Sequence, residues 1–115
     1  MEINITPVDD IKVIAVSGDI DASTAPTAQK EILPVAEEGN PILLDLTKVE
    51  YMSSAGLRVL LSVYRQITAK DIPFVLVGLS EELQDTMSVT GFLDFFTICE
   101  TRDAGLEELQ NLVAC

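Results

Sequence analysis

The positions of apolar and polar residues along the chain predict an alternation of strands and helices. Short apolar or β-branched runs, which are typical of strands, lie at residues 3–7, 12–16, 41–46, 74–77 and 95–99. After the second, third, fourth and fifth runs, apolar residues recur at the spacing of an amphipathic helix. The pattern therefore predicts about five strands and about four helices, in the order β-β-α-β-α-β-α-β-α. This order favours an α/β sandwich with a mostly parallel central sheet and helices on its faces.

The strand signals differ in strength. The runs at 41–46 and 74–77 are apolar almost throughout, as in strands buried on both faces of a parallel sheet. The first run, 3–7, is weaker and predicts a short edge strand. Asp9 and Asp10 follow it as a turn that leads into the strand at 12–16.

Capping and breaking residues limit the first predicted helix. Ser23 or Thr24 is placed to cap its start, and Pro26 suits its first turn, where no backbone donor is needed. The breaker at 39–41 ends it. Pro34 lies inside the helical pattern, so we expect a kink or an early end there.

The other helices are predicted in the same way. The second begins near Ser54, and its apolar stripe consists of Leu57, Leu60, Leu61, Tyr64 and Ile67. Ser80 is placed to cap the third helix, and Gly91 to end it. The fourth begins near Asp103 and carries on one face Leu106, Leu109, Leu112 and Val113.

Length and composition indicate one compact unit. The chain has 115 residues, of which 48% are hydrophobic, which is enough for a single core. It shows no linker or repeat, so we expect a single domain over 1–115. No apolar run approaches the ~18 residues that span a bilayer, and the acidic start at 1–4 lacks the basic region of a signal peptide. We therefore expect a soluble, cytoplasmic protein.

The charge limits the partners. The chain carries 19 acidic and 7 basic residues, and its formal net charge is −12. Such a charge repels nucleic acid and anionic membrane surfaces, and it favours basic partners or simply solubility. We therefore expect neither a nucleic-acid partner nor a membrane partner.

The residue types that are absent limit the chemistry. The chain has no histidine, which excludes Ser-His-Asp and Cys-His nucleophile pairs and histidine-bound zinc. Its cysteines, Cys99 and Cys115, form no CxxC pair and predict no disulfide. No metal-ligand cluster or glycine-rich phosphate loop is visible. We therefore expect no enzyme activity, no metal and no cofactor.

Residues 45–58 are the strongest candidate for a functional site. A predicted buried strand leads through a short loop to Ser53 and Ser54, either of which can cap the helix that follows. A helix cap alone explains one serine. The second serine, and the small residues Ala55 and Gly56 that leave the start of the helix open, keep a modification site open as the alternative to a simple cap. A phosphate there would meet the free N–H groups and the positive dipole of the helix.

This segment resembles a known signature. The residues at 51–61 read Tyr-Met-Ser-Ser-Ala-Gly-Leu-Arg-Val-Leu-Leu. They are similar to the phosphorylation site of the STAS domain, which is found in bacterial anti-sigma factor antagonists. The loop Gly18-Asp19-Ile20-Asp21 resembles a second landmark of this family. The resemblance covers essentially the whole chain and implies a STAS-like sandwich, with one STAS domain over 1–115.

The resemblance also assigns the phosphate acceptor. The family motif often reads Asp-Ser-Ser-Gly or Asp-Ser-Thr-Gly, with the phosphate on the first hydroxyl residue. Matched on Gly56, that acceptor falls on Ser54, and Ser53 is the second choice. The chain departs from the motif twice, because Ser53 replaces the Asp and Ala55 replaces the second hydroxyl residue. The implied partner-binding residues are Asp19, Asp21, Ser53, Ser54, Ala55, Gly56 and Arg58.

The mechanism that the resemblance implies is partner switching. The unphosphorylated protein would bind an anti-sigma factor that is also an ATP-dependent serine kinase, and so free the sigma factor. Phosphorylation of Ser54 would dissociate the complex. A metal-dependent serine phosphatase would then remove the phosphate and reset the switch. We expect a monomer or a weak dimer. Of the neighbouring residues, Arg58 either contacts the partner or lies on a solvated helix face, and Tyr51 and Met52 are either interface anchors or packing residues.

Two alternatives stay open. The same domain can serve as a scaffold in a stress-sensing complex or as an accessory subunit of a transport system. A phospho-receiver is the second, because Asp9, Asp10, Asp45 and Lys70 are the residue types of its acidic pocket. A receiver, however, needs its paired acids at the end of a buried first strand, whereas Asp9 and Asp10 precede the strong strand.

Overall fold

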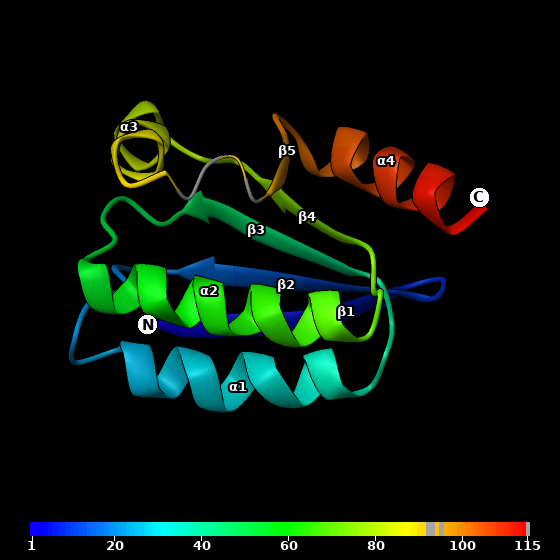
Figure 1. Ribbon diagram of the computed structural model, residues 1–115, viewed down its shortest axis with the longest axis horizontal. Coiled ribbons are helices and arrows are strands. Elements are labelled where there is room, and N and C mark those ends of the chain that lie inside the picture. The colour runs from blue at the N-terminus through cyan, green and yellow to red at the C-terminus, as the bar shows by residue number, and fades with distance from the viewer. Residues whose placement is uncertain (92–93, 95, 115) are drawn as a thin grey trace.

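The fold follows the predicted order of elements. The structure, a computed structural model, describes residues 1–91, 94 and 96–114, and for 112–114 the backbone only (Figure 1). Within these residues the elements are β1 (Glu2–Val8), β2 (Ile11–Ser17), α1 (Ala25–Glu37), β3 (Ile42–Lys48), α2 (Ser54–Ala69), β4 (Phe74–Val77), α3 (Glu81–Val89), β5 (Thr97–Cys99) and α4 (Arg102–Ala114).

The strands form one mixed sheet. Its strands lie in the order β1-β2-β3-β4-β5. Strand β1 pairs antiparallel with β2 through the turn at Asp9 and Asp10, and the other neighbours are parallel. The predicted α/β sandwich with a mostly parallel sheet is therefore confirmed.

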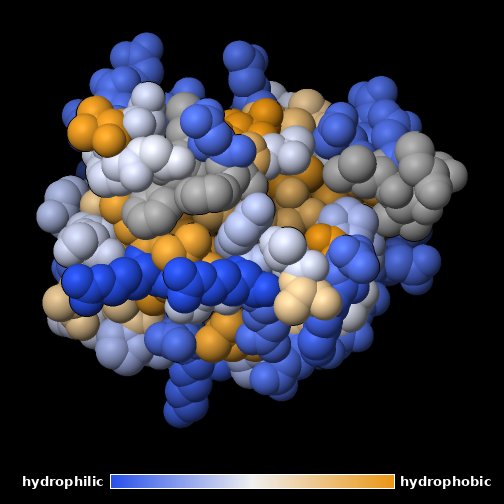
Figure 2. All heavy atoms as spheres, viewed as in Figure 1, coloured by the Kyte–Doolittle hydropathy of each residue, from blue (hydrophilic) through white to orange (hydrophobic). Residues whose placement is uncertain are grey.

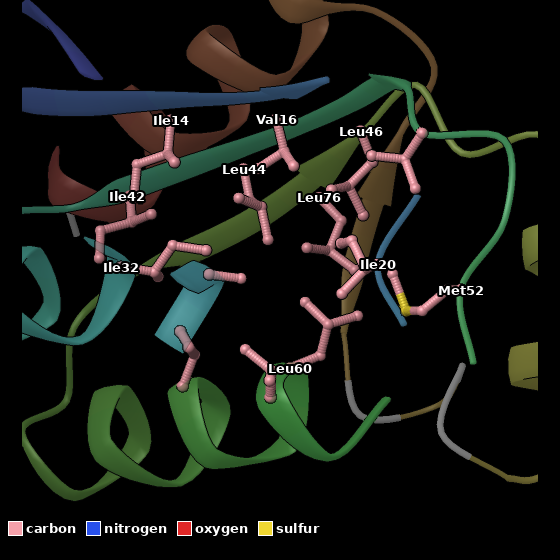
Figure 3. Close-up of a cluster of buried hydrophobic side chains, with 14 of the residues drawn as sticks. Ile14, Val16, Ile20, Ile32, Ile42, Leu44, Leu46, Met52, Leu60 and Leu76 are labelled. Atoms are coloured by element: carbon pink, nitrogen blue, oxygen red, sulfur yellow. The ribbon is translucent and has the colours of Figure 1, made fainter. Parts of the chain in front are cut away.

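Helices α1 and α2 cover one face of the sheet and lie side by side (Figure 1). Ile14, Leu44 and Leu76 are register partners on β2, β3 and β4, and all three are buried. In Figure 3 they point from the strands towards Ile32 of α1 and Leu60 of α2. Because the apolar stripes of both helices meet these side chains, the main core forms between the sheet and this helix pair.

Helix α4 covers part of the opposite face. Val13, Leu43 and Val75 are register partners there and form a second cluster with Leu109. Gly105 lets the helix approach, because a Cβ at this position would lie 2.8 Å from Cδ1 of Leu43. The central strands are thus buried on both faces, as their uninterrupted apolar runs predict.

Hydrophilic and apolar residues both reach the surface. On the face seen in Figure 2, hydrophilic side chains surround the molecule and apolar atoms show between them. No helix within the described part of the chain is long and apolar enough to cross a membrane.

The predicted early end of the first helix at Pro34 is wrong. Helix α1 continues through this residue to Glu37. Ile32 before the proline and Val35 and Ala36 after it are all buried, so packing on both sides outweighs the lost hydrogen bond. A kink at Pro34 stays a prediction.

The stripe predicted for the second helix is only partly right. Leu57, Leu60 and Ile67 are buried, but Leu61 and Tyr64 are only half-buried. The buried face also contains Gly56, Val59 and Val63, which the prediction left out. The wider face reflects packing against the sheet and α1 together, which the single stripe did not anticipate.

The C-terminal predictions are tested in part. The predicted strand at 95–99 is observed over Thr97–Cys99, and residue 95 lies outside the described residues. On α4, Leu109 is buried and Leu106 half-buried, as predicted. The side chains of Leu112 and Val113 lie outside the described part.

Candidate partner-binding site at the carboxyl edge of the sheet

The two segments singled out in the sequence leave the sheet at the same edge. Strands β2 and β3 are parallel, and in Figure 1 both arrows point to the same side of the molecule. The loop after β2 carries Asp19 and Asp21, and the loop after β3 leads to Ser53 and Ser54. Loops at the carboxyl ends of parallel strands commonly form binding sites in α/β proteins.

Backbone hydrogen bonds join the two loops. The N–H of Gly18 donates to the C=O of Lys48 (3.1 Å). The N–H of Ile20 donates to the C=O of Tyr51 (3.0 Å), and the C=O of Ile20 accepts from the N–H of Ser53 (2.8 Å). The pairing of β2 with β3 thus continues beyond the sheet and holds the serine loop in place.

The side chains of Ile20 and Met52 fill the space beneath these bonds. The backbones of the two residues form an isolated parallel β-bridge, and both side chains are buried (Figure 3). Helix α2 approaches the bridge so closely that a Cβ on Gly56 would lie 2.6 Å from Cγ of Met52 and 2.8 Å from the C=O of Ile20. Met52 is therefore a packing residue, whereas the side chain of Tyr51 is 55% exposed. The packing alternative is thus confirmed for Met52, whereas a role of Tyr51 as an interface anchor stays a prediction.

Ser53 occupies the N-cap position of α2, and Ser54 is the first residue of the helix. The Ser53 hydroxyl makes no capping hydrogen bond. Its Oγ is buried and has no partner among the described residues. Ser54 is exposed, and Ala55 is half-buried behind it. The first helical bond runs from the N–H of Leu57 to the C=O of Ser53 (3.0 Å), so the N–H groups of residues 54–56 precede it, and the Ser53 side chain does not cap them.

Asp21 organises the loop before α1. Its Oδ1 accepts from the hydroxyl of Ser23 (2.7 Å), the N–H of Ser23 (2.9 Å) and the N–H of Thr24 (3.1 Å). These bonds, above all that from the Ser23 hydroxyl, lower the pKa of Asp21. Thr24 is the N-cap residue, but its hydroxyl donates to the C=O of Asp19 (2.8 Å) and makes no cap bond. Of the two predicted capping residues, Thr24 is therefore confirmed as the N-cap residue, but the predicted side-chain bond is not made. The Asp21 carboxylate instead holds the turn that precedes the helix.

The remaining predicted residues differ in exposure. Asp19 and Arg58 are exposed, and Arg58 lies one helical turn after Ser54 on α2. Gly56 is buried beneath the joined loops. The structure thus brings Asp19, Asp21 and the two serines to one edge, with Gly56 as a packing position below them.

A hollow that sequence reasoning missed opens at the same edge. It lies between the loop after β3 and the start of α3, and its volume is about 450 Å³. Its lining residues are Thr47, Val49, Glu50, Ser80, Glu81 and Glu82. The available signal was the position of Glu81 and Glu82, which follow the predicted strand at 74–77 in the first turn of the next predicted helix and so lie at the edge that carries the serines.

The acidic residues of the receiver alternative do not come together. Asp9 and Asp10 form the turn before β2, whereas Asp45 pairs in register with Ala15 near the other end of that strand. The described residues contain no group of three or more His, Cys, Asp or Glu side chains that could hold a metal ion.

Asp45 is instead part of a contact between β3 and α4. It is 9% exposed, and its Oδ2 accepts from the guanidinium of Arg102 (2.7 Å). Its Oδ1 accepts from the N–H and the hydroxyl of Thr47. Burial raises the pKa of Asp45, but the hydrogen bonds from Thr47 and the charge of Arg102 outweigh it, so the pKa is lowered.

The fold and this edge define a class of protein. Residues 2–105 match the family model of the STAS domain, and the chain belongs to that family.

Its relatives are regulatory proteins. An anti-sigma-B factor antagonist from Listeria monocytogenes is 40% identical over 87 residues, which cover 74% of this chain and 75% of that protein. The crystal structure of an anti-sigma factor antagonist from Mycobacterium paratuberculosis has a TM-score of 0.87 and 28% identity, and the match covers 95% and 93% of the two chains. The Bacillus cell fate determinant SpoIIAA, in its phosphorylated form, shares the fold with a TM-score of 0.73 at 16% identity, over 94% and 99%.

Proposed function

We propose that this chain is an anti-sigma factor antagonist that acts by partner switching, with residues 1–115 working as one STAS domain. The unphosphorylated protein binds an anti-sigma factor that is also an ATP-dependent serine kinase, and thereby frees the sigma factor. The protein is a cytoplasmic binding protein rather than an enzyme. It needs no cofactor, and it takes neither nucleic acid nor membrane as a partner.

The observation that carries this proposal is the position of Ser54. Its side chain is exposed at the first position of a 16-residue helix, next to N–H groups that no side chain caps. The loop before it is fixed by hydrogen bonds to the neighbouring loop. A rigidly held, accessible hydroxyl suits a kinase that must align it with a nucleotide, and it is equally accessible to the metal-dependent phosphatase that resets the switch.

The charge of a phosphate explains the switching. A phosphate on Ser54 adds about 1.5–2 negative charges, and the helix N-terminus accommodates them without rearrangement. A kinase bound for phosphoryl transfer holds the phosphates of its nucleotide opposite this hydroxyl. After transfer, two anionic groups would face each other, with Asp19 on the same edge, so the complex dissociates.

The test is phosphosite mapping by tandem mass spectrometry after incubation with host extract, Mg²⁺ and ATP. We expect the phosphate on Ser54. Phosphate on Ser53 would keep the mechanism and move the acceptor by one residue. If neither serine is modified while a control substrate is, the switch is excluded. The alternative role, as a scaffold in a stress-sensing complex or an accessory of a transport system, would then be the better explanation.

A further inference from the structure

Tyr51 is an exposed aromatic side chain on a rigid loop. Its side chain is 55% exposed, whereas the neighbouring Met52 is buried. Its backbone C=O is fixed by the N–H of Ile20. An aromatic group held in this way loses little freedom on binding, which is the property of an interface anchor. It precedes Ser54 by three residues in the same loop.

The hollow beside Tyr51 is acidic. Glu50, the residue directly before Tyr51, lines it together with Glu81 and Glu82 of α3, and all three side chains are exposed. Among the described residues the one ion pair is that between Arg102 and Asp45, so these three carboxylates are not neutralised by a basic side chain of the chain. The volume of about 450 Å³ admits the head group of a lysine or an arginine.

We propose that Tyr51 and this hollow form the docking surface for the kinase of the proposed function, on which this inference rests. The kinase offers an apolar socket for the Tyr51 ring and places a lysine or arginine side chain among Glu50, Glu81 and Glu82. Binding energy thus comes from beside Ser54 rather than from the serine itself. This leaves the Ser54 hydroxyl free to meet the nucleotide.

The negative charge of the chain favours a basic protein surface as the partner at this site. The net charge of −12 repels nucleic acid and anionic lipid, and it also repels a second copy of this chain. A protein surface with basic residues around an apolar socket is complementary to both parts of the patch. The same attraction predicts that binding weakens as salt is added.

The test uses two pairs of matched variants and the kinase purified from the host by its activity on Ser54. Tyr51→Ala removes the aromatic anchor, and its control is Val89→Ala, because Val89 is 87% exposed on α3. Glu50→Lys reverses one charge of the hollow, and its control is Glu107→Lys on α4, where the residue is also exposed. Kd is measured by titration calorimetry in low and physiological salt, and thermal unfolding checks that every variant is folded.

We expect Tyr51→Ala to weaken binding about 30-fold. Glu50→Lys is expected to weaken it about 10-fold in low salt and to reduce the salt dependence. Both controls stay within about twofold of the unchanged protein. If Tyr51→Ala and Glu50→Lys bind normally while Ser54→Asp does not, the docking surface is wrong and the proposed function stands. If Ser54→Asp binds as well as the unchanged protein, or if the extract contains no kinase for Ser54, the proposed function fails and the docking surface with it.

Discussion

Two serines start helices in this protein, and their hydroxyl groups behave differently. Ser80 is the N-cap of α3, and its Oγ accepts from the N–H of Leu83 (3.1 Å). Ser53 is the N-cap of α2, and its buried Oγ has no hydrogen-bond partner in the described part of the chain. The same residue type at the same helical position therefore stabilises one helix and not the other.

We expect Ser80→Ala to lower the free energy of unfolding by about 1 kcal/mol, because it removes a capping bond. Ser53→Ala is expected to change it by less than about 0.5 kcal/mol, because no hydrogen bond is lost and a buried unpaired polar atom is removed. Urea unfolding of both variants measures the difference. A larger loss for Ser53→Ala than for Ser80→Ala would contradict this explanation.

Gly56 tests how tightly the serine loop is packed. Gly56→Ala places a Cβ 2.6 Å from Cγ of Met52 and 2.8 Å from the C=O of Ile20. Because one of these contacts is with backbone, we expect a loss of about 2–3 kcal/mol in the free energy of unfolding. Gly39→Ala is the comparison, since no atom lies within 4 Å of its Cβ and only the φ of +87° opposes the substitution. Its expected loss is about 1 kcal/mol, and an equal loss at both positions would argue against crowding at Gly56.

How far the site could be predicted differs from residue to residue. The sequence placed a serine at the start of a helix, but it left Ser53 and Ser54 equivalent as caps. Which hydroxyl is exposed depends on the hydrogen bond that the N–H of Ser53 makes to Ile20, more than 30 residues earlier in the chain. Likewise, the bonds that the Asp21 carboxylate accepts from Ser23 and Thr24 depend on a local turn, whose geometry a spacing rule cannot give.

At the scale of elements, an ion pair fastens α4 to the sheet. Arg102 is the first residue of α4, and its guanidinium contacts the buried Asp45 of β3 at 2.7 Å. Gly105 and Leu109 continue the contact as apolar packing. A charged contact at the start of the helix thus complements an apolar contact along it.

This ion pair predicts a dependence of stability on pH. The pKa of Asp45 is lowered in the folded protein. Its stabilising contribution is therefore complete above the unfolded pKa of about 3.9 and is lost as the pH falls through the lower, folded pKa. Asp45→Asn is expected to lower the free energy of unfolding by about 1–3 kcal/mol at pH 7, because the Arg102 guanidinium loses its charged partner.

The matching measurement is urea unfolding at pH 7 and pH 2.5. The difference between Asp45→Asn and the unchanged protein is expected to shrink at the lower pH, because this pH lies below the unfolded pKa and the contribution of the Asp45 carboxylate is being lost. Arg102→Met serves as the control for the other partner. A difference that is the same at both pH values would assign the effect to packing rather than to charge.

The order and type of the elements could be predicted because each strand and helix has its own periodicity. The strand at 74–77 is an example, since its limits agree with β4. That α1 continues through Pro34 could not be predicted, because the burial of Val35 and Ala36 depends on a sheet whose strands lie elsewhere in the sequence. The width of the apolar face of α2 also depends on α1, which packs beside it.

At the scale of the whole molecule, the proposed switch changes the surface and leaves the fold intact. Ser54→Asp puts a negative charge in the first turn of α2, where it interacts favourably with the helix dipole. We expect the free energy of unfolding to rise by about 0.3–1 kcal/mol while binding to the kinase is lost. Ser54→Ala is expected to keep binding. Chemical denaturation and titration calorimetry on the same preparations give both readouts, and a destabilised Ser54→Asp would indicate a conformational switch instead.

The hydrogen bonds that join the loop after β2 to the loop after β3 also determine when a newly made chain can be recognised by a partner. Ile20 and Ser53 lie far apart in the sequence, and they meet only after both strands have paired. An incompletely folded chain presents Ser54 on a flexible segment, without the aligned loop that a kinase must recognise. Under the proposed function, freshly synthesised protein therefore competes for the anti-sigma factor only once its sheet is complete.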